Sequence, residues 1–227
     1  MNTEKNIKTL IVKKPLKLDC GKTINDFPIA YETYGTLNSK KDNAILVFHA
    51  LTGDQFVTGI NPVTKKEGWW SYAVGPGKAI DTNKYFVICS NVIGGCMGSY
   101  GPSNKDSNQN IFGTNFPVIT INDMVNAQYN LLDYFGIDKL FSIAGGSMGG
   151  MQVLQFISNF PDKSKTVIPI ATTSSHSAQN IAFNELGRQA ITADNDWKDG
   201  NYASHETNPG KGLAVARMAA HITYLSK

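Results

Sequence analysis

The sequence lacks the features of secreted, membrane-spanning and nucleic-acid-binding proteins. No stretch of its 227 residues is apolar for long enough to cross a bilayer. The first fourteen residues, MNTEKNIKTLIVKK, carry an acid and no apolar region followed by a small-residue cleavage site, so no signal peptide is expected. The lysines are scattered and the formal net charge is only +3, which disfavours a nucleic-acid-binding surface.

Cysteine is also scarce. Cys20, Cys89 and Cys96 are odd in number, and their spacing fits neither a disulfide framework nor a zinc site. We interpret them as free thiols in a reducing compartment, so the sequence predicts a cytoplasmic protein. No metal and no redox cofactor are expected.

Strand-like and helix-like segments alternate along the chain. Two compact, β-branched and aromatic runs, at 44–51 and 85–92, predict strands buried on both faces, and 139–145 and 166–172 predict two further strands. Two segments with helical spacing follow the second and third of these strands, at 121–136 and 151–161. This order predicts a mostly parallel α/β sheet with flanking helices. Residues 27–35 alternate with period two, which predicts an antiparallel strand added at the front.

A glycine-rich turn joins the third predicted strand to its helix. Gly145-Gly146-Ser147-Met148-Gly149 has the pattern G-x-S-x-G, and its strand-to-helix position is the context of a nucleophile elbow. The alternative is a glycine-rich turn with an incidental serine. We favour Ser147 as a nucleophile, because the small neighbours allow the sharp backbone turn and the helix start favours an oxyanion.

An acyl-transferring serine also needs an oxyanion hole. The backbone N–H of Met148, which follows the nucleophile, is one candidate donor. The N–H of Leu51, in the stretch HALTGD (49–54), is the other. His49 could serve as a general base, but in this chain order a structural role that shapes the turn is favoured. Cys96 is a rival nucleophile that no elbow presents, and GGCMGSYG (94–101) lacks dinucleotide-loop spacing.

The chain resembles the homoserine O-acetyltransferases, acyltransferases of methionine biosynthesis within the α/β-hydrolase superfamily. Six segments carry the resemblance in family order: HALTGD (49–54), NVIGGCMGSYGPS (91–103), FPVITINDMVNAQ (116–128), GGSMGGMQ (145–152), AQNIAFNELGRQAI (178–191) and GLAVARMAAHITYLS (212–226). The resemblance implies an α/β-hydrolase core at 1–175 and the start of a helical lid at 176–227. It also implies transfer of an acetyl group from acetyl-CoA to L-homoserine through an acyl-Ser147 intermediate. Family members commonly form dimers through the lid.

Arg217, His221 and Tyr224 fall on one face of a predicted helix. By themselves they fit a surface arginine with a tyrosine packed beside it. The resemblance implies that Arg217 binds the substrate carboxylate, with Tyr224 as its neighbour. For Arg188, an ion pair with Glu185 three residues earlier is a sufficient explanation.

The sequence departs from the family in the catalytic triad. In this superfamily an acid and then a histidine follow the serine. His176, His205 and His221 lie in segments that resemble the lid or the approach to it, and none aligns with the triad. We therefore expect an N-terminal fragment without the C-terminal strands and part of the lid. On that interpretation the triad Asp and His lie beyond Lys227, and the 227-residue chain alone is inactive.

Three other functions stay open. The same fold could use succinyl-CoA or acylate another hydroxy amino acid. The protein could be a serine hydrolase that shares only the elbow and the fold with these acyltransferases. The chain could also be a non-catalytic binding fragment.

Overall fold

The computed structural model describes residues 7–224. Two predictions fall partly outside this range. They concern the first six residues, within the segment where no signal peptide is expected, and residues 225–226, at the end of the last matching segment. Within 7–224, no helix has both the length and the apolar character needed to cross a membrane.

The chain divides into two compact units, which we describe separately. The first, called the α/β unit, contains the residues up to Gly101 and Pro117–Thr173. The second, called the helical unit, contains Pro102–Phe116 and the residues from Ser174 onward.

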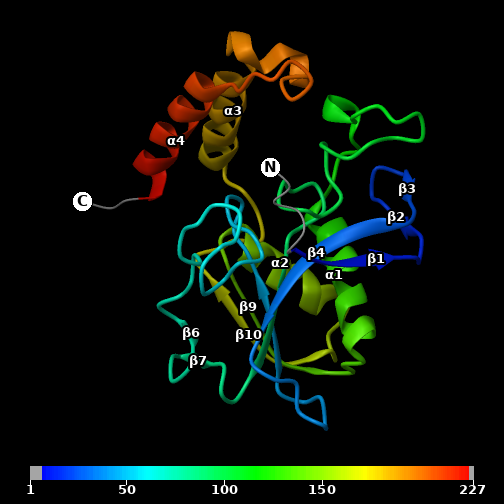
Figure 1. The fold of residues 1–227 in the computed structure, drawn as a ribbon. Coiled ribbons are helices and arrows are strands. Elements are labelled where there is room, and N and C mark those ends of the chain that lie inside the picture. The colour runs from blue at the N-terminus through cyan, green and yellow to red at the C-terminus, as the bar shows by residue number, and fades with distance from the viewer. Residues whose placement is uncertain (1–6, 225–227) are drawn as a thin grey trace. The chain divides into compact units, whose positions relative to one another are not determined.

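The α/β unit is built on a six-stranded sheet (Figure 1), with strand order β1-β4-β8-β5-β9-β10. The strand bounds are Lys8–Val12 for β1, Phe27–Tyr34 for β4, Ala44–Phe48 for β5, Phe86–Ser90 for β8, Leu140–Gly146 for β9 and Ser164–Ile170 for β10. The pairs β8–β5, β5–β9 and β9–β10 are parallel, whereas β1–β4 and β4–β8 are antiparallel. The predicted parallel α/β sheet and its antiparallel front strand are therefore confirmed.

The α/β unit also contains two separate two-stranded sheets. β2 (Leu16–Lys17) pairs with β3 (Thr23–Ile24), and β6 (Val74–Gly75) pairs with β7 (Ile80–Asp81). The sequence analysis missed these pairs and β1, because two-residue bridges have no periodicity and β1 is largely exposed.

Helix α1 (Ile121–Phe135) begins and ends with clear capping signals. Thr120 is the N-cap and forms a capping box with Asp123, while Gly136 ends the helix in the left-handed region at φ 65°. The predicted helical segment 121–136 is confirmed, and its N-cap is Thr120, the residue just before it. Thr120 is favoured as the N-cap because the Asp123 carboxylate, three residues later, accepts a hydrogen bond from the Thr120 N–H.

Helix α2 (Met148–Asn159) starts earlier than predicted. The expected start was residue 151, after the last glycine, but helical backbone begins directly after Ser147. Both glycines of this first turn, Gly149 and Gly150, are buried against neighbouring segments. Close packing therefore outweighs the low helix propensity of glycine here.

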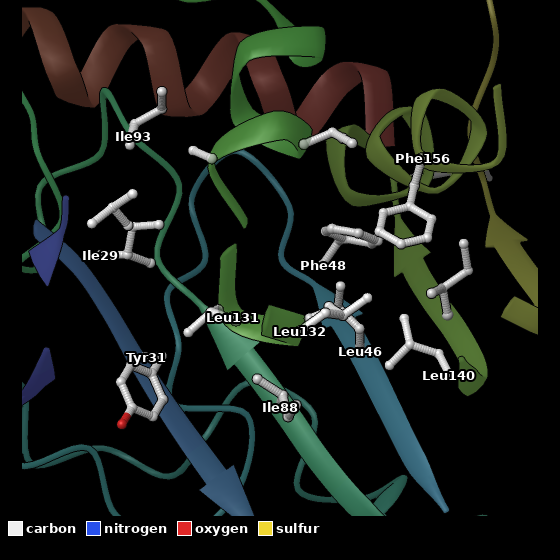
Figure 2. Packing of buried hydrophobic residues seen from close by; sticks show 14 of the residues in the cluster. Ile29, Tyr31, Leu46, Phe48, Ile88, Ile93, Leu131, Leu132, Leu140 and Phe156 are labelled. Atoms are coloured by element: carbon white, nitrogen blue, oxygen red, sulfur yellow. The ribbon is translucent and has the colours of Figure 1, made fainter. Parts of the chain in front are cut away.

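One face of the sheet packs on α1 and α2, and Figure 2 shows part of this cluster. Alternate residues of β5 and the inner faces of both helices supply it, including Leu46, Phe48, Leu131, Leu132 and Phe156. The rings of Phe48 and Phe156 lie 6.0 Å apart, which joins the end of β5 to α2. Because successive strand residues alternate sides, the other β5 residues point to the opposite face.

The opposite face is covered by the long connection after β5. Ile45 and Val47 pack there with Val57 and Val74 from that connection. Trp69 and Trp70, stacked with ring centroids 5.5 Å apart, lie against the same cluster. The central strands are thus buried on both faces, as their uninterrupted apolar sequences predict.

The helical unit contains α3 (Ala178–Thr192) and α4 (Gly210–Tyr224), with the 3-10 turns η2 (Gly113–Asn115) and η3 (Asn195–Gly200). Helix α4 approaches α3 closely at Gly212, where a Cβ would lie 2.3 Å from the Ala190 carbonyl oxygen. Asp194 accepts a hydrogen bond of 2.8 Å from the Gly212 N–H. This contact fixes the start of α4 against the end of α3.

Candidate active site

Ser147 stands at the junction of β9 and α2 in a strained conformation. Its φ of 55° and ψ of −119° are rare for a residue with a side chain. Backbone hydrogen bonds hold it there: the Ser147 N–H donates to the Ile170 oxygen at 3.0 Å, and the Thr172 hydroxyl donates to the Ser147 oxygen at 2.8 Å. The residue is exposed. This strained, exposed strand-to-helix turn has the geometry expected of a nucleophile elbow.

Two glycines flank this turn at positions where no side chain fits. A Cβ on Gly145 would lie 2.4 Å from the Gly149 oxygen, and a Cβ on Gly149 would lie 2.1 Å from the Phe48 oxygen. Gly146 is different, because a Cβ built on it would have its nearest neighbouring atom 3.9 Å away. The first and last glycines of G-x-S-x-G are therefore required by packing.

The two predicted oxyanion donors lie on segments that this packing brings together. Met148 is the first residue of α2, and the Leu51 N–H lies in the turn after β5. The Gly149–Phe48 approach places the start of α2 against the end of β5. In the described part of the chain, neither N–H has a hydrogen-bond acceptor. The positive end of the α2 dipole also favours negative charge at this place.

His49 orients the turn that carries Leu51. Its Nδ1 lies 2.7 Å from the Ala50 oxygen, and its Nε2 accepts from the Val92 N–H at 3.2 Å. Nδ1 therefore carries the proton and donates it to Ala50. The Ala50–Leu51 peptide is planar and trans, so the Ala50 carbonyl and the Leu51 N–H point in opposite directions. A hydrogen bond that holds the Ala50 oxygen therefore also fixes the direction of the Leu51 N–H.

His49 is buried, and burial lowers its pKa below the ordinary 6.5. The hydrogen bond to the Ala50 oxygen and the nearby Asp54 carboxylate raise the pKa and only partly offset this effect. The ring is thus neutral, and its hydrogen bonds are made to Ala50, Val92 and Asn91, not to Ser147. These contacts match the structural role expected for it.

The loop 91–101 buttresses this turn. The Asn91 side chain contacts His49 Nε2 at 3.3 Å and accepts from the Met97 N–H at 3.0 Å. The Ser99 hydroxyl donates to the backbone carbonyl oxygen of Asn91 at 2.6 Å. Cys96 is an exposed free thiol on this loop, and unlike Ser147 it does not have a positive φ, so no strained turn presents it. Sequence reasoning missed the roles of Asn91 and Ser99, although polar residues at the end of a buried strand were a usable signal.

The helical unit carries the predicted substrate-binding residues. Arg217, His221 and Tyr224 lie on α4 and are exposed, and His221 Nδ1 lies 2.9 Å from the Arg217 oxygen one turn earlier. The expected ion pair is present: an Arg188 guanidinium nitrogen lies 2.6 Å from Glu185.

The same unit contains a cavity of about 490 Å³ with an apolar, aromatic lining. Its walls are formed by Arg188, Ile191, Thr192, Trp197, Tyr202, Asn208, Pro209 and Leu213. The rings of Trp197 and Tyr202 are stacked 5.6 Å apart. Arg217 does not line this cavity.

Other groups that could bind a metal or supply a triad are dispersed. Within the described residues, no three His, Cys, Asp or Glu side chains gather as metal ligands. His49 is the only histidine of the α/β unit, and His176, His205 and His221 are exposed residues of the helical unit.

Comparisons with known proteins agree with this geometry. The family model of the alpha/beta hydrolase fold matches residues 43–226. The homoserine O-acetyltransferase of Pelagibacter ubique is 74% identical over the whole chain, and the chain covers 61% of that relative. The homoserine O-acetyltransferase of Mesorhizobium japonicum is 61% identical over 94% of the chain, which covers 55% of that relative.

Solved structures resemble the chain as well. The crystal structure of homoserine O-acetyltransferase from Bacillus anthracis has a TM-score of 0.85 and 31% identity, covering 96% of this chain and 60% of its own. The crystal structure of esterase E22 has a TM-score of 0.87 and 30% identity, and the match covers 97% of this chain and 62% of the esterase chain. The chain thus spans about three fifths of the length of these proteins. The strand order, the elbow at Ser147 and the match over residues 43–226 together show that the chain belongs to the α/β-hydrolase fold family.

Proposed function

We propose that the protein transfers an acetyl group from acetyl-CoA to the hydroxyl of L-homoserine through an acyl-Ser147 intermediate. The observation that carries the proposal is the strained, exposed Ser147 between β9 and α2, in a chain 74% identical to a homoserine O-acetyltransferase. Methionine biosynthesis in the cytoplasm is the corresponding setting.

In the first half-reaction, the Ser147 oxygen attacks the thioester carbon of acetyl-CoA. The carbonyl oxygen becomes an oxyanion, to which the N–H groups of Leu51 and Met148 donate in this proposal. The carbon–sulfur bond then breaks, CoA leaves as a thiol with the serine proton, and the acetyl group stays on Ser147. A general base must carry that proton. His49 is excluded from this role, because its ring nitrogens are engaged with other groups.

In the second half-reaction, the homoserine hydroxyl attacks the acetyl-Ser147 ester. The same N–H groups stabilise the second oxyanion, and Ser147 leaves with the proton of the incoming hydroxyl. Arg217 is proposed to bind the homoserine carboxylate through two parallel N–H···O bonds, with Tyr224 beside it. Such binding favours homoserine over water, because it holds the hydroxyl in position to attack.

The test is CoA release by the protein expressed from its complete reading frame. Release from acetyl-CoA is measured with L-homoserine, with L-serine and with water alone, and succinyl-CoA replaces acetyl-CoA in a parallel series. The proposal expects release that depends on both acetyl-CoA and homoserine and that Ser147→Ala abolishes. Equal release with and without homoserine contradicts it, and a preference for succinyl-CoA corrects the donor.

Ester hydrolysis is a second candidate function. The fold similarity to esterase E22 supports it, since that protein covers 97% of this chain at a TM-score of 0.87. Hydrolysis of p-nitrophenyl acetate that homoserine neither accelerates nor diverts to O-acetylhomoserine favours this candidate.

Pairing of two copies through the helical unit is also part of the proposal. Apolar side chains are exposed along α3 and α4, among them Ile181, Leu186, Val215, Met218 and Ile222. Exposed apolar surface of this kind commonly marks an interface. Sedimentation equilibrium measures the mass, which should be twice that of one chain.

A further inference from the structure

A chain of buried polar side chains runs through the core of the α/β unit. The Ser90 hydroxyl donates to Gln128 Oε1 at 2.7 Å, and Gln128 Nε2 donates to Gln152 Oε1 at 2.6 Å. Gln152 Nε2 then donates to the carbonyl oxygens of His49 at 3.3 Å and Met148 at 3.4 Å. Ser90, Gln128 and Gln152 are almost completely buried.

The direction of this chain is fixed from one end. The carbonyl oxygens of His49 and Met148 can only accept, so the Gln152 amide nitrogen faces them and its Oε1 faces Gln128. Gln128 therefore presents its amide nitrogen to Gln152, and its Oε1 is left to accept from the Ser90 hydroxyl. Buried amides are costly without partners, so a core that retains two of them needs every one of these contacts.

The two carbonyls at the end of the chain belong to the two segments that carry the oxyanion donors. Met148 provides one donor itself, and His49 begins the turn that leads to Leu51. A single amide group therefore links the start of α2 to the end of β5. The NH₂ group has one hydrogen for each acceptor, and both N···O distances are longer than usual, so each of these hydrogen bonds is weak.

Packing also joins these two segments, because the rings of Phe48 and Phe156 lie 6.0 Å apart, but an apolar ring contact has little directional preference. The close approach of Gly149 to Phe48 limits how near the two segments can come. It is a repulsive limit and does not prevent them from separating. Gln152 adds a directional hydrogen bond to the His49 carbonyl oxygen, which opposes separation next to the two donors.

We propose that Gln152 is a positioning residue that sets the distance between the Leu51 and Met148 N–H groups, with Gln128 holding its amide in the productive orientation. The inference rests on the function proposed above, in which both N–H groups stabilise an oxyanion. Gln152 itself touches neither Ser147 nor the reacting atoms.

The test compares Gln152→Met with a matched variant on the same helix, Val153→Ala. Val153 is fully buried and apolar, so its truncation lowers stability without touching the polar chain. Acylation of Ser147 by p-nitrophenyl acetate and transfer from acetyl-CoA to homoserine are both measured, together with the midpoint of thermal unfolding. We expect Gln152→Met to lower kcat about 10-fold to 100-fold and to change KM by less than about twofold.

The double variant Gln128→Met/Gln152→Met separates positioning from stability. It removes both buried amides, so the unfolding midpoint should recover toward that of the wild type. The kcat should stay as low as in Gln152→Met. If kcat instead follows the unfolding midpoint across all three variants, Gln152 is merely structural and the inference is wrong.

Crystal structures of the wild type and Gln152→Met give a measurement that does not depend on the proposed reaction. The separation of the Leu51 and Met148 nitrogens should change by about 0.5 Å, the tolerance of a preorganised site. An unchanged separation overturns the inference. If Ser147 is acylated but no homoserine-dependent transfer occurs, the proposed function is wrong and the inference about Gln152 is not affected. The acylation rates and the crystal structures still decide the role of Gln152.

Discussion

The Gly149 Cα lies so close to the end of β5 that a Cβ built on it would come within 2.1 Å of the Phe48 carbonyl oxygen. This approach joins the turn that carries Ser147 to the turn that carries Leu51. The last glycine of the G-x-S-x-G pattern thus serves a contact with another strand, in addition to the turn in which it lies.

Gly149→Ala should destabilise the protein by about 3 kcal/mol, because overpacking against backbone atoms cannot be relieved by a side-chain rotation. Gly146→Ala is the matched control, since its new Cβ would have no neighbour nearer than 3.9 Å. Urea unfolding of the two variants measures the difference. Equal stabilities would show that the β5–α2 approach is not tight in solution.

Ser147→Gly should be more stable than Ser147→Ala. Both lose the hydroxyl, but only glycine adopts φ 55°, ψ −119° without strain. The expected gain is about 1 kcal/mol, because relief of 1–3 kcal/mol of strain is partly offset by the greater freedom of unfolded glycine. Thermal unfolding of the pair tests this. A more stable alanine variant would mean that the turn is not strained.

Stability should fall as pH drops below about 6.5, the ordinary pKa of histidine. Burial lowers the pKa of His49 in the folded protein, so in this window the unfolded chain binds a proton that the folded protein does not. The loss is at most about 1.4 kcal/mol per pH unit and stops below the folded pKa. Urea unfolding between about pH 8 and pH 5 measures it.

His49→Gln should flatten this pH dependence. His221→Gln, which removes an exposed histidine, should leave it in place. The reverse outcome would assign the acid sensitivity to the helical unit.

Cys89 should be inert to thiol reagents in the folded protein. It is buried, and burial raises the pKa of its thiol well above the ordinary value, so little reactive thiolate forms. Cys20 and Cys96 are exposed. A disulfide reagent such as Ellman's reagent should therefore modify two thiols quickly and the third only after unfolding. Rapid modification of all three would show that β8 opens readily.

Arg217→Ala should raise the KM for homoserine about 10-fold to 100-fold, the loss expected for a charge-assisted bidentate contact. Arg217→Lys keeps the charge but not the planar fork, so it should recover only part of this loss. Arg188→Ala is the control, because Arg188 is paired with Glu185. If Arg217→Ala leaves the KM unchanged, the carboxylate is bound elsewhere.

The sequence by itself determined the sheet strands from β4 onward, helix α1, helix α2 apart from its first turn, and the position of Ser147. Long apolar runs, helical spacing and the G-x-S-x-G pattern are local signals, since each arises from neighbours along the chain. The Gly136 C-cap and the Arg188–Glu185 pair were predictable for the same reason.

Only the tertiary structure decided which glycines are indispensable, why His49 is neutral and where the buried glutamines donate. Gly149 meets Phe48, His49 meets Val92, and Gln152 meets both Gln128 and His49, all across long intervals of sequence. Such contacts leave no periodic trace, because they depend on how strands and helices are brought together and not on the residues beside them.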